Sequence, residues 1–329
     1  MLTDSFGRKI TYLRLSVTDR CNFRCVYCLP EIYSRFSPLE NVLTDDEIVR
    51  LISLFANLGL SRVRITGGEP LLRPGIVDLV GRLHAIPGIS DLSLSTNGFL
   101  LKKMASDLAR AGLSRVNISL DSLKPERFEE ITRFGTFNDV WEGIQSAQEA
   151  GLSPIKINAV VMKGINEDEI PDFVALTEKN SLHVRFIELM PMGETGFFTK
   201  ERWLPYDEIR ALAGPLEELP LDEKPVGFGP AHYFRRPGAR GTVGIISALS
   251  CGFCSSCNRV RLTSTGTLVP CLDAMEGTDL KSALRNGSSD QDIRNLILQT
   301  IQKKPEHHFM GERTEGKTSN ARFMCQVGG

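Results

Sequence analysis

Short apolar runs alternate with helical patterns along the first 190 residues of this 329-residue chain. Strand–helix alternation predicts βαβ units and therefore a parallel sheet. The helical stretches have recognisable ends, with a capping box at residues 44–47 and glycines at 59, 112 and 151 that stop helices. Six units are fewer than the eight of a closed TIM barrel, so we expect an incomplete (β/α)6 barrel of TIM type. The predicted strands are residues 12–17, 62–66, 91–94, 115–120, 154–160 and 183–188.

The last third of the chain has a different character. Proline and glycine are dense between residues 204 and 244, and two short strands are predicted at 232–235 and 242–246. Two helices are predicted at 279–285 and 290–303. We therefore expect two regions, a partial barrel over residues 1–200 and a C-terminal α+β extension over residues 201–329.

Composition restricts the class of protein. The net charge is −1, which predicts no bulk surface for nucleic acid or membrane. No apolar run approaches the roughly 18 residues that span a bilayer. The first ten residues contain no apolar segment of a signal peptide. We therefore expect a cytoplasmic protein, in which clustered cysteines indicate metal sites rather than disulfides.

Two groups of cysteines stand out. One has the spacing C-x3-C-x2-C and the other C-x2-C-x13-C. Four thiolates saturate a zinc ion or a [4Fe–4S] cluster, whereas three leave one iron free to hold a small molecule. Two three-cysteine groups therefore predict two open iron–sulfur clusters. A non-catalytic protein whose metal sites only hold the fold together remains an alternative. The predicted ligands are Cys21, Cys25 and Cys28, and Cys254, Cys257 and Cys271.

The unusual residues follow the predicted strands in phase. The first cysteine group follows strand one, residues 67–70 (Gly-Gly-Glu-Pro) follow strand two, and residues 95–98 (Ser-Thr-Asn-Gly) follow strand three. Residues 119–122 close strand four, Lys156 lies in strand five, and residues 190–193 follow strand six. Taken singly, several of these motifs are also ordinary turns. Because parallel strands of a barrel end at one mouth, together they predict a single active-site cavity.

The first cysteine motif, with Tyr27 directly before Cys28, resembles the signature of radical S-adenosylmethionine (SAM) enzymes. Residues 13–25, 64–71 and 253–263, with the terminal Gly328 and Gly329, resemble the GTP 3′,8-cyclase family of molybdenum cofactor biosynthesis. This resemblance extends over essentially the whole chain.

The resemblance implies a reaction. In this family the first [4Fe–4S] cluster reduces SAM to methionine and a 5′-deoxyadenosyl radical, which abstracts the 3′-hydrogen of GTP. The product would be (8S)-3′,8-cyclo-7,8-dihydroguanosine 5′-triphosphate, an early intermediate of molybdopterin biosynthesis. A second [4Fe–4S] cluster would hold the guanine. The implied partners are GTP, an electron donor and the next pathway enzyme, cyclic pyranopterin monophosphate synthase; the oligomeric state stays open, a homodimer included.

The resemblance also assigns roles to individual residues. The terminal glycines and two of the arginines are implied to assist the radical step. Permanently charged guanidinium groups suit a triphosphate in a chain without a Walker loop. The implied SAM contacts are Tyr27, Gly68, Glu69, Ser119 and Met190. The implied GTP contacts are Arg14, Arg64, Ser95, Lys156, Arg259 and Arg261, and the implied catalytic residues are Arg259, Arg261, Gly328 and Gly329.

Two cysteines depart from the family pattern. Cys251 adds a thiol three residues before Cys254, and as a fourth ligand it would close the second cluster. We favour the ligand set without it because the family spacing is already met. Cys325 lies in the tail where the pattern suggests serine, and we interpret it as a small neutral substitution. The nearest rival enzyme class is a peptide-modifying radical SAM maturase with two clusters.

Overall fold

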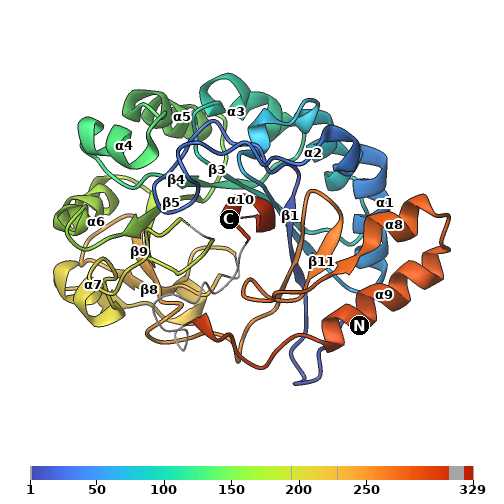
Figure 1. Ribbon diagram of the computed structural model, residues 1–329. Helices are drawn as coiled ribbons and strands as arrows, with labels where there is room; N and C mark the ends of the chain where they lie inside the picture. The colour runs from blue at the N-terminus through green and yellow to red at the C-terminus, as the bar shows by residue number, and fades with distance from the viewer. Residues whose placement is uncertain (1, 194, 228, 311–321, 329) are drawn as a thin grey trace.

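The strands of the computed structural model form one mixed sheet that curves into a partial barrel (Figure 1). The structure describes residues 2–193, 195–227, 229–310 and 322–328. The sheet has the order β12-β11-β10-β1-β2-β3-β4-β5-β6-β9-β8-β7. Its strands are β1 (Tyr12–Ser16), β2 (Arg62–Thr66), β3 (Asp91–Thr96), β4 (Arg115–Ser119), β5 (Ile155–Val161), β6 (His183–Glu188), β7 (Glu217–Glu218), β8 (His232–Arg235), β9 (Thr242–Ile246), β10 (Arg259–Leu262), β11 (Thr267–Val269) and β12 (Thr278–Asp279).

The predicted α/β partial barrel is confirmed, and all six predicted barrel strands are present within two residues at either end. The predicted number of parallel strands, six, was too small. β9 pairs in parallel with β6, and β10 pairs in parallel with β1, so the C-terminal region adds a parallel strand at each edge of the barrel sheet. The extension is thus continuous with the sheet. β10 was missed as a barrel strand because its partner in the sheet, β1, lies more than 240 residues earlier in the chain.

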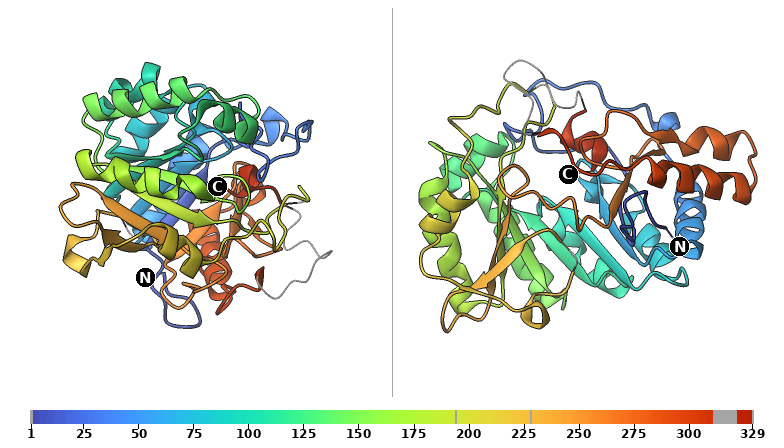
Figure 2. Two further views of the ribbon diagram at one scale, coloured as in Figure 1. Left: turned by 90° about the vertical axis from the view of Figure 1, so that its left-hand side faces the viewer. Right: turned by 90° about the horizontal axis from the view of Figure 1, so that it is seen from below.

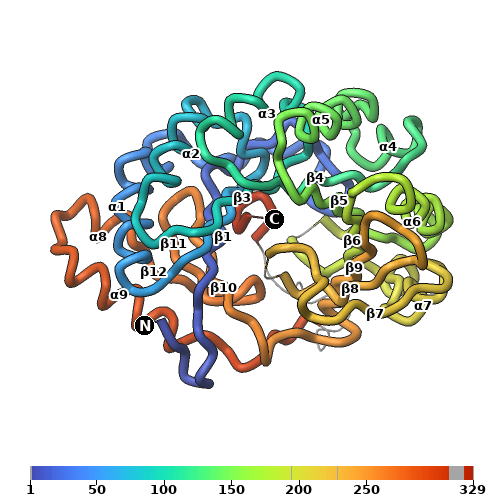
Figure 3. The backbone as a smooth tube through the Cα atoms, turned by 180° about the vertical axis from the view of Figure 1, so that it is seen from behind, coloured from blue at the N-terminus to red at the C-terminus, as the bar shows by residue number. Residues whose placement is uncertain are grey.

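Helices surround the sheet on its outer side, and Figure 3 shows the same ring from behind. α1 begins with the predicted capping box, in which Thr44 Oγ1 accepts from Glu47 N and the Glu47 carboxylate accepts from Thr44 N. Gly59, Gly112 and Gly151 have φ of 100°, 98° and 76°, as a helix-ending position requires. The helices are α1 (Asp45–Asn57), α2 (Ile76–His84), α3 (Leu101–Arg110), α4 (Pro125–Thr132), α5 (Phe137–Glu149), α6 (Ile170–Lys179), α7 (Tyr206–Leu212), α8 (Leu280–Arg285), α9 (Asp290–Gln302) and α10 (Met324–Val327).

The two faces of the barrel sheet differ in chemistry. Residues facing the helices are apolar and buried, as Leu13, Val63 and Ile118 show. The alternate positions point inward and are largely polar, as Arg14 and Asn117 show. The hydrophobic core therefore lies between sheet and helices, and the barrel interior is left for a polar site.

The short helix α10 lies inside the barrel. Figures 1 and 2 show α10 at the centre of the ring of strands, far from its sequence neighbours α8 and α9, which lie outside. None of the helices in the described ranges is long and apolar enough to cross a membrane.

Candidate active site

A cavity that is partly open to solvent occupies the barrel interior. The structure brings most of the sequence-predicted residues to its wall, although they come from segments up to 250 residues apart. The predicted residues that line it are Arg14, Cys21, Cys25, Tyr27, Cys28, Arg64, Gly68, Ser95, Ser119, Met190, Arg259 and Arg261.

Six other predicted residues that the structure describes lie outside the lining, among them Gly328 of the tail. Glu69 and Lys156 are buried. The second cysteine group lies next to the lining, because its sequence neighbours Phe253 and Leu272 line the cavity. Gly329 lies outside the described residues. The second group consists of Cys254, Cys257 and Cys271.

The first cysteine group forms a compact loop after β1. Phe23 N donates to Cys21 Sγ at 3.4 Å, and Cys28 N donates to the Cys25 carbonyl at 2.8 Å. Burial raises the pKa of Cys21 and of Cys28 to about 12, and burial together with neighbouring negative charge raises that of Cys25. Thiolates in such a place require positive charge from a metal. Three adjacent, partly buried thiols thus fit a cluster with one open iron.

The Gly-Gly-Glu-Pro motif packs against the chain that leads into this loop. A Cβ on Gly67 would lie 2.4 Å from the Thr18 carbonyl oxygen, and one on Gly68 would lie 2.3 Å from the Arg20 carbonyl oxygen. Gly68 N also donates to the Thr18 carbonyl at 2.7 Å. These close approaches explain why both positions need glycine.

Glu69 connects the loops rather than facing the cavity. Its carboxylate accepts from Leu71 N at 3.0 Å, Thr96 Oγ1 at 2.7 Å and Asn97 N at 2.7 Å. Burial raises the pKa of Glu69 to about 7, against the effect of these hydrogen bonds. Asn97 Nδ2 in turn donates to Asn22 Oδ1 at 2.8 Å, inside the cysteine loop. Glu69 therefore joins the loops after β2 and β3.

Asp121 is a functional candidate that the sequence analysis did not assign. It lines the cavity, and its carboxylate accepts from Tyr27 OH and from Val160 N, at 2.7 and 2.8 Å. Burial raises the pKa of Asp121 to about 6, although both hydrogen bonds oppose the shift. The sequence feature that could have identified Asp121 is an acidic residue at the end of a predicted barrel strand.

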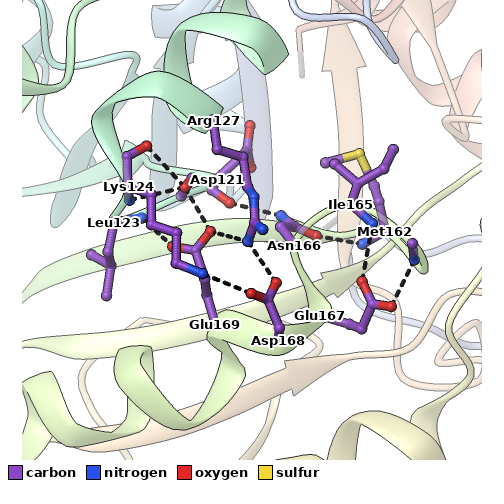
Figure 4. Close-up of polar contacts among 12 residues, drawn as sticks. Asp121, Leu123, Lys124, Arg127, Met162, Ile165, Asn166, Glu167, Asp168 and Glu169 are labelled. Carbon is purple, nitrogen blue, oxygen red and sulfur yellow. Dashed lines mark hydrogen bonds and ion pairs between the residues drawn. The ribbon is translucent and has the colours of Figure 1, made fainter.

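A hydrogen-bond network holds Asp121 from behind (Figure 4). Asn166 Nδ2 donates to the Asp121 carbonyl at 2.7 Å, and Asn166 Oδ1 accepts from Met162 N at 2.8 Å. The buried Glu169 accepts from Ser122 Oγ at 2.7 Å and from Arg127 at 2.6 Å. The loop after β4 is therefore fixed to the segment that begins α6.

Guanidinium groups form a row across the inner face. Strand register aligns Arg261 of β10 with Arg14 of β1, and Arg14 with Arg64 of β2. Residues two apart on a strand share a face, so Arg259 lines the cavity beside Arg261. Burial lowers the pKa of both Arg64 and Arg261 to about 10. Arg64 is buried and the other three are partly buried, and such a row of cations suits a ligand with several negative charges.

Three polar cavity residues were missed on the strands opposite the arginine row: Asn117, Asn158 and Arg185. With its amide oxygen toward them, Asn117 accepts hydrogen bonds from Arg64 and Arg185. Arg185 Nε donates to Asn158 Oδ1 at 2.8 Å. The sequence feature that could have identified them was a polar residue at an alternate position of an otherwise apolar strand.

Lys156 is almost completely buried at this wall. Its Nζ donates to the Val226 carbonyl at 2.7 Å and lies 5.6 Å from the centre of the Tyr233 ring. Burial, and then the charges of Arg185, Arg115 and Arg64, lower the pKa of Lys156 to about 5.

The second cysteine group surrounds the start of β10. Burial raises the pKa of Cys254, with smaller contributions from Cys271 and Cys257. For Cys257 the burial effect is outweighed by the charges of Arg259 and Lys304, and its pKa falls to about 7. Cys251 is exposed to solvent. Within the described ranges no three Cys, His, Asp or Glu side chains are placed to hold a single metal ion.

The C-terminal tail reaches the arginine row. Arg14 Nε donates to the Gly328 carbonyl at 3.2 Å, and Arg261 donates to the same oxygen and to the Val327 carbonyl at 3.1 Å. Gly328 has φ of +75°, and a Cβ there would lie 2.6 Å from Thr66 Cγ2. Cavity wall and tail therefore make direct contact.

Comparison with known proteins places this site in a family. Residues 15–177 match the model of the radical SAM superfamily, and residues 182–310 match that of Molybdenum Cofactor Synthesis C. GTP 3′,8-cyclase of Heliobacterium modesticaldum is 48% identical over 100% of both chains, and that of Desulforamulus reducens is 45% identical over 100% of both. The chain belongs to the GTP 3′,8-cyclase family. The family resemblance seen in the sequence is thereby confirmed.

The fold agrees with this membership. The crystal structure of Streptococcus suis SuiB bound to S-adenosylmethionine is 16% identical, with a TM-score of 0.60, and the match covers 87% of this chain and 68% of that one. At this identity the likeness concerns the fold alone. The radical SAM assignment implies a [4Fe–4S] cluster and SAM as cofactors.

Proposed function

We propose that this chain converts GTP to (8S)-3′,8-cyclo-7,8-dihydroguanosine 5′-triphosphate in molybdenum cofactor biosynthesis. The observation that carries the proposal is full-length identity of 48% to a GTP 3′,8-cyclase, in a chain whose cavity joins three partly buried thiols to a row of arginines. The thiols and the arginines lie on one continuous wall, as a reaction between a SAM-derived radical and a nucleotide requires.

The SAM end of the cavity is formed by the loops after β1, β2 and β4. Cys21, Cys25 and Cys28 would hold the cluster, which supplies the electron that cleaves SAM. Backbone groups at Gly68 can approach SAM closely because the position has no side chain. The remaining SAM contacts that we propose are Tyr27, Ser119 and Met190, while Glu69 fixes the loop that contains Gly68.

The GTP end is formed by the arginine row and the C-terminal region. Arg14, Arg64 and Arg261 would bind the triphosphate, together with Arg259, Ser95 and Lys156. We propose a second [4Fe–4S] cluster on Cys254, Cys257 and Cys271, with one iron open to the guanine. The exposed Cys251 would not be a ligand. The tail glycines, Gly328 and Gly329, would bring backbone groups to the reacting nucleotide.

Further partners follow from the chemistry. Cleavage of SAM needs an electron donor, and the cyclic triphosphate would be passed to cyclic pyranopterin monophosphate synthase. Residues 1–200 would form the SAM-binding region and residues 201–329 the region of the second cluster. A homodimer is compatible with this arrangement.

The test is an anaerobic incubation of reconstituted protein with SAM, dithionite and either GTP or ATP. Mass spectrometry would quantify 5′-deoxyadenosine and nucleotide isomers. The proposal predicts deoxyadenosine and an isomer of GTP only in the GTP reaction. Deoxyadenosine formed equally without GTP would overturn the substrate and leave the radical SAM assignment, in favour of a peptide-modifying maturase.

A further inference from the structure

A buried lysine after α9 connects two segments of the second cysteine group. Lys304 is 3% exposed, and its Nζ donates to the Arg259 carbonyl at 2.9 Å and to the Pro270 carbonyl at 2.8 Å. Arg259 lies two residues after Cys257, and Pro270 directly precedes Cys271. One ammonium group therefore holds together the segments that carry two of the three proposed ligands.

The third proposed ligand is connected to the same place by Arg8, from the beginning of the chain. Arg8 Nη1 donates to the Cys254 carbonyl at 2.7 Å. The same guanidinium group donates to the carbonyls of Pro305 and Glu306, at 2.6 and 2.8 Å. These two residues directly follow Lys304 in the chain. All three ligand segments are thus tied to one short segment, residues 304–306.

The two cations differ in what balances their charge. Arg8 Nε forms an ion pair with the Asp4 carboxylate at 2.6 Å. The two acceptors of Lys304 are neutral carbonyl groups, and a buried ammonium group is costly unless a negative charge balances it. A [4Fe–4S] cluster on three thiolates is an anion, and reduction adds one more negative charge. A cluster on the second cysteine group would supply the missing balance.

We propose that Lys304 is a positioning residue of the second cluster, which fixes two of its ligand segments and stabilises its reduced form through a buried positive charge. The inference rests on the proposed function in one respect, namely that Cys254, Cys257 and Cys271 hold a cluster. Lys304 does not line the cavity, so it acts on the cluster through the segments that it holds. One of these segments includes Arg259, a proposed GTP contact, so the same lysine couples the cluster to the substrate end of the cavity.

The experiment compares three variants of the reconstituted holoenzyme. Lys304→Met removes the charge and both hydrogen bonds, and Lys304→Gln removes the charge but keeps an N–H donor. Lys303→Met is the control, because Lys303 is the exposed neighbour of Lys304. Iron release to a chelator measures how firmly each cluster is held. Redox titration followed by electron paramagnetic resonance measures the potential of the cluster whose spectrum does not change when SAM is added.

We expect Lys304→Met to release the iron of the second cluster about tenfold faster than the wild type, since residues that support metal ligands contribute on this scale. Without the positive charge the reduced form is less stable. In both Lys304 variants the ratio of reduced to oxidised second cluster should therefore fall about tenfold at a fixed potential, which is 59 mV. Lys303→Met should match the wild type in both measurements.

An unchanged potential in the Lys304 variants would overturn the inference, and so would an equal fall in Lys303→Met. A wild-type rate of iron release in Lys304→Met would overturn the role in holding the ligand segments. If Lys304→Met also loses the SAM-sensitive cluster, its fold is disturbed, and the potential of Lys304→Gln decides. A wild type that holds only a SAM-sensitive cluster would instead overturn the second cluster of the proposed function.

Discussion

Tyr27 and Asp121 share one buried hydrogen bond of 2.7 Å at the SAM end of the cavity. We predict that Tyr27→Phe and Asp121→Asn each weaken SAM binding about tenfold, since a hydrogen bond to a charged group contributes about 1.5–3 kcal/mol. The double variant should lose no more than either single variant, because both remove the same contact. Calorimetric titration with SAM would measure affinity, with iron content as the control for cluster loss. Additive losses would contradict a shared role.

The environment of Lys156 leads us to predict that GTP binding is coupled to the uptake of a proton. With a pKa of about 5 it is neutral at pH 7, because burial and nearby arginines disfavour its charge. A bound triphosphate favours the charged form and raises the pKa of Lys156, so binding takes up a proton and strengthens as pH falls toward 5. Titration calorimetry with GTP in buffers of different ionisation enthalpy would measure this uptake. Lys156→Met should abolish it, and an uptake that persists in this variant would assign the proton elsewhere.

Site residues that belong to a motif with fixed spacing were predictable from the sequence. Site residues whose role depends on which face of a strand they occupy were not. The first cysteine group lines the cavity as its spacing suggested. Asp121 and Arg185 were missed because a single polar residue in an apolar strand does not reveal its partner. Asn97 and Tyr33 contact residues that lie 75 and 293 positions away along the chain. No local sequence pattern reveals such contacts.

At the scale of elements, the loop after β2 depends on space rather than on helix or strand propensity. We predict that Gly68→Ala displaces this loop, because its Cβ would lie 2.3 Å from the Arg20 carbonyl oxygen. Overpacking of this kind costs about 1–3 kcal/mol. The temperature of thermal unfolding and the affinity for SAM should both be lower in Gly68→Ala than in the wild type. Gly81→Ala in α2 is the control, since its Cβ would meet nothing closer than 4.0 Å; equal behaviour of the two variants would refute the steric account.

Strands of the βαβ units were predicted closely, as β2 and β6 agree residue for residue. β10 has the same alternation of arginine and aliphatic residues as β2, so its composition does not explain why it was missed. Its place beside β1 depends on closing the sheet over more than 240 residues, which no local pattern shows.

At the scale of the whole molecule, the first cysteine group lines the cavity and the second, from a distant part of the chain, lies next to it. We predict about eight irons per chain after reconstitution, and about four after Cys271→Ser, which removes a ligand of the second cluster. Cys251→Ser should keep all eight, because the exposed thiol is not needed. Iron and sulfide analysis of the wild type and both variants would measure the number of clusters per chain. A loss of four irons in Cys251→Ser would make Cys251 a ligand and close the site proposed for guanine.

The central claim is that a radical formed at the first cysteine group reacts with a nucleotide held by the arginine row. The most direct test is GTP deuterated at C3′, incubated anaerobically with the protein, SAM and dithionite. We predict that one deuterium from C3′ appears in the methyl group of 5′-deoxyadenosine, together with a cyclised GTP. Deoxyadenosine without deuterium, formed at the same rate with and without GTP, would contradict the account.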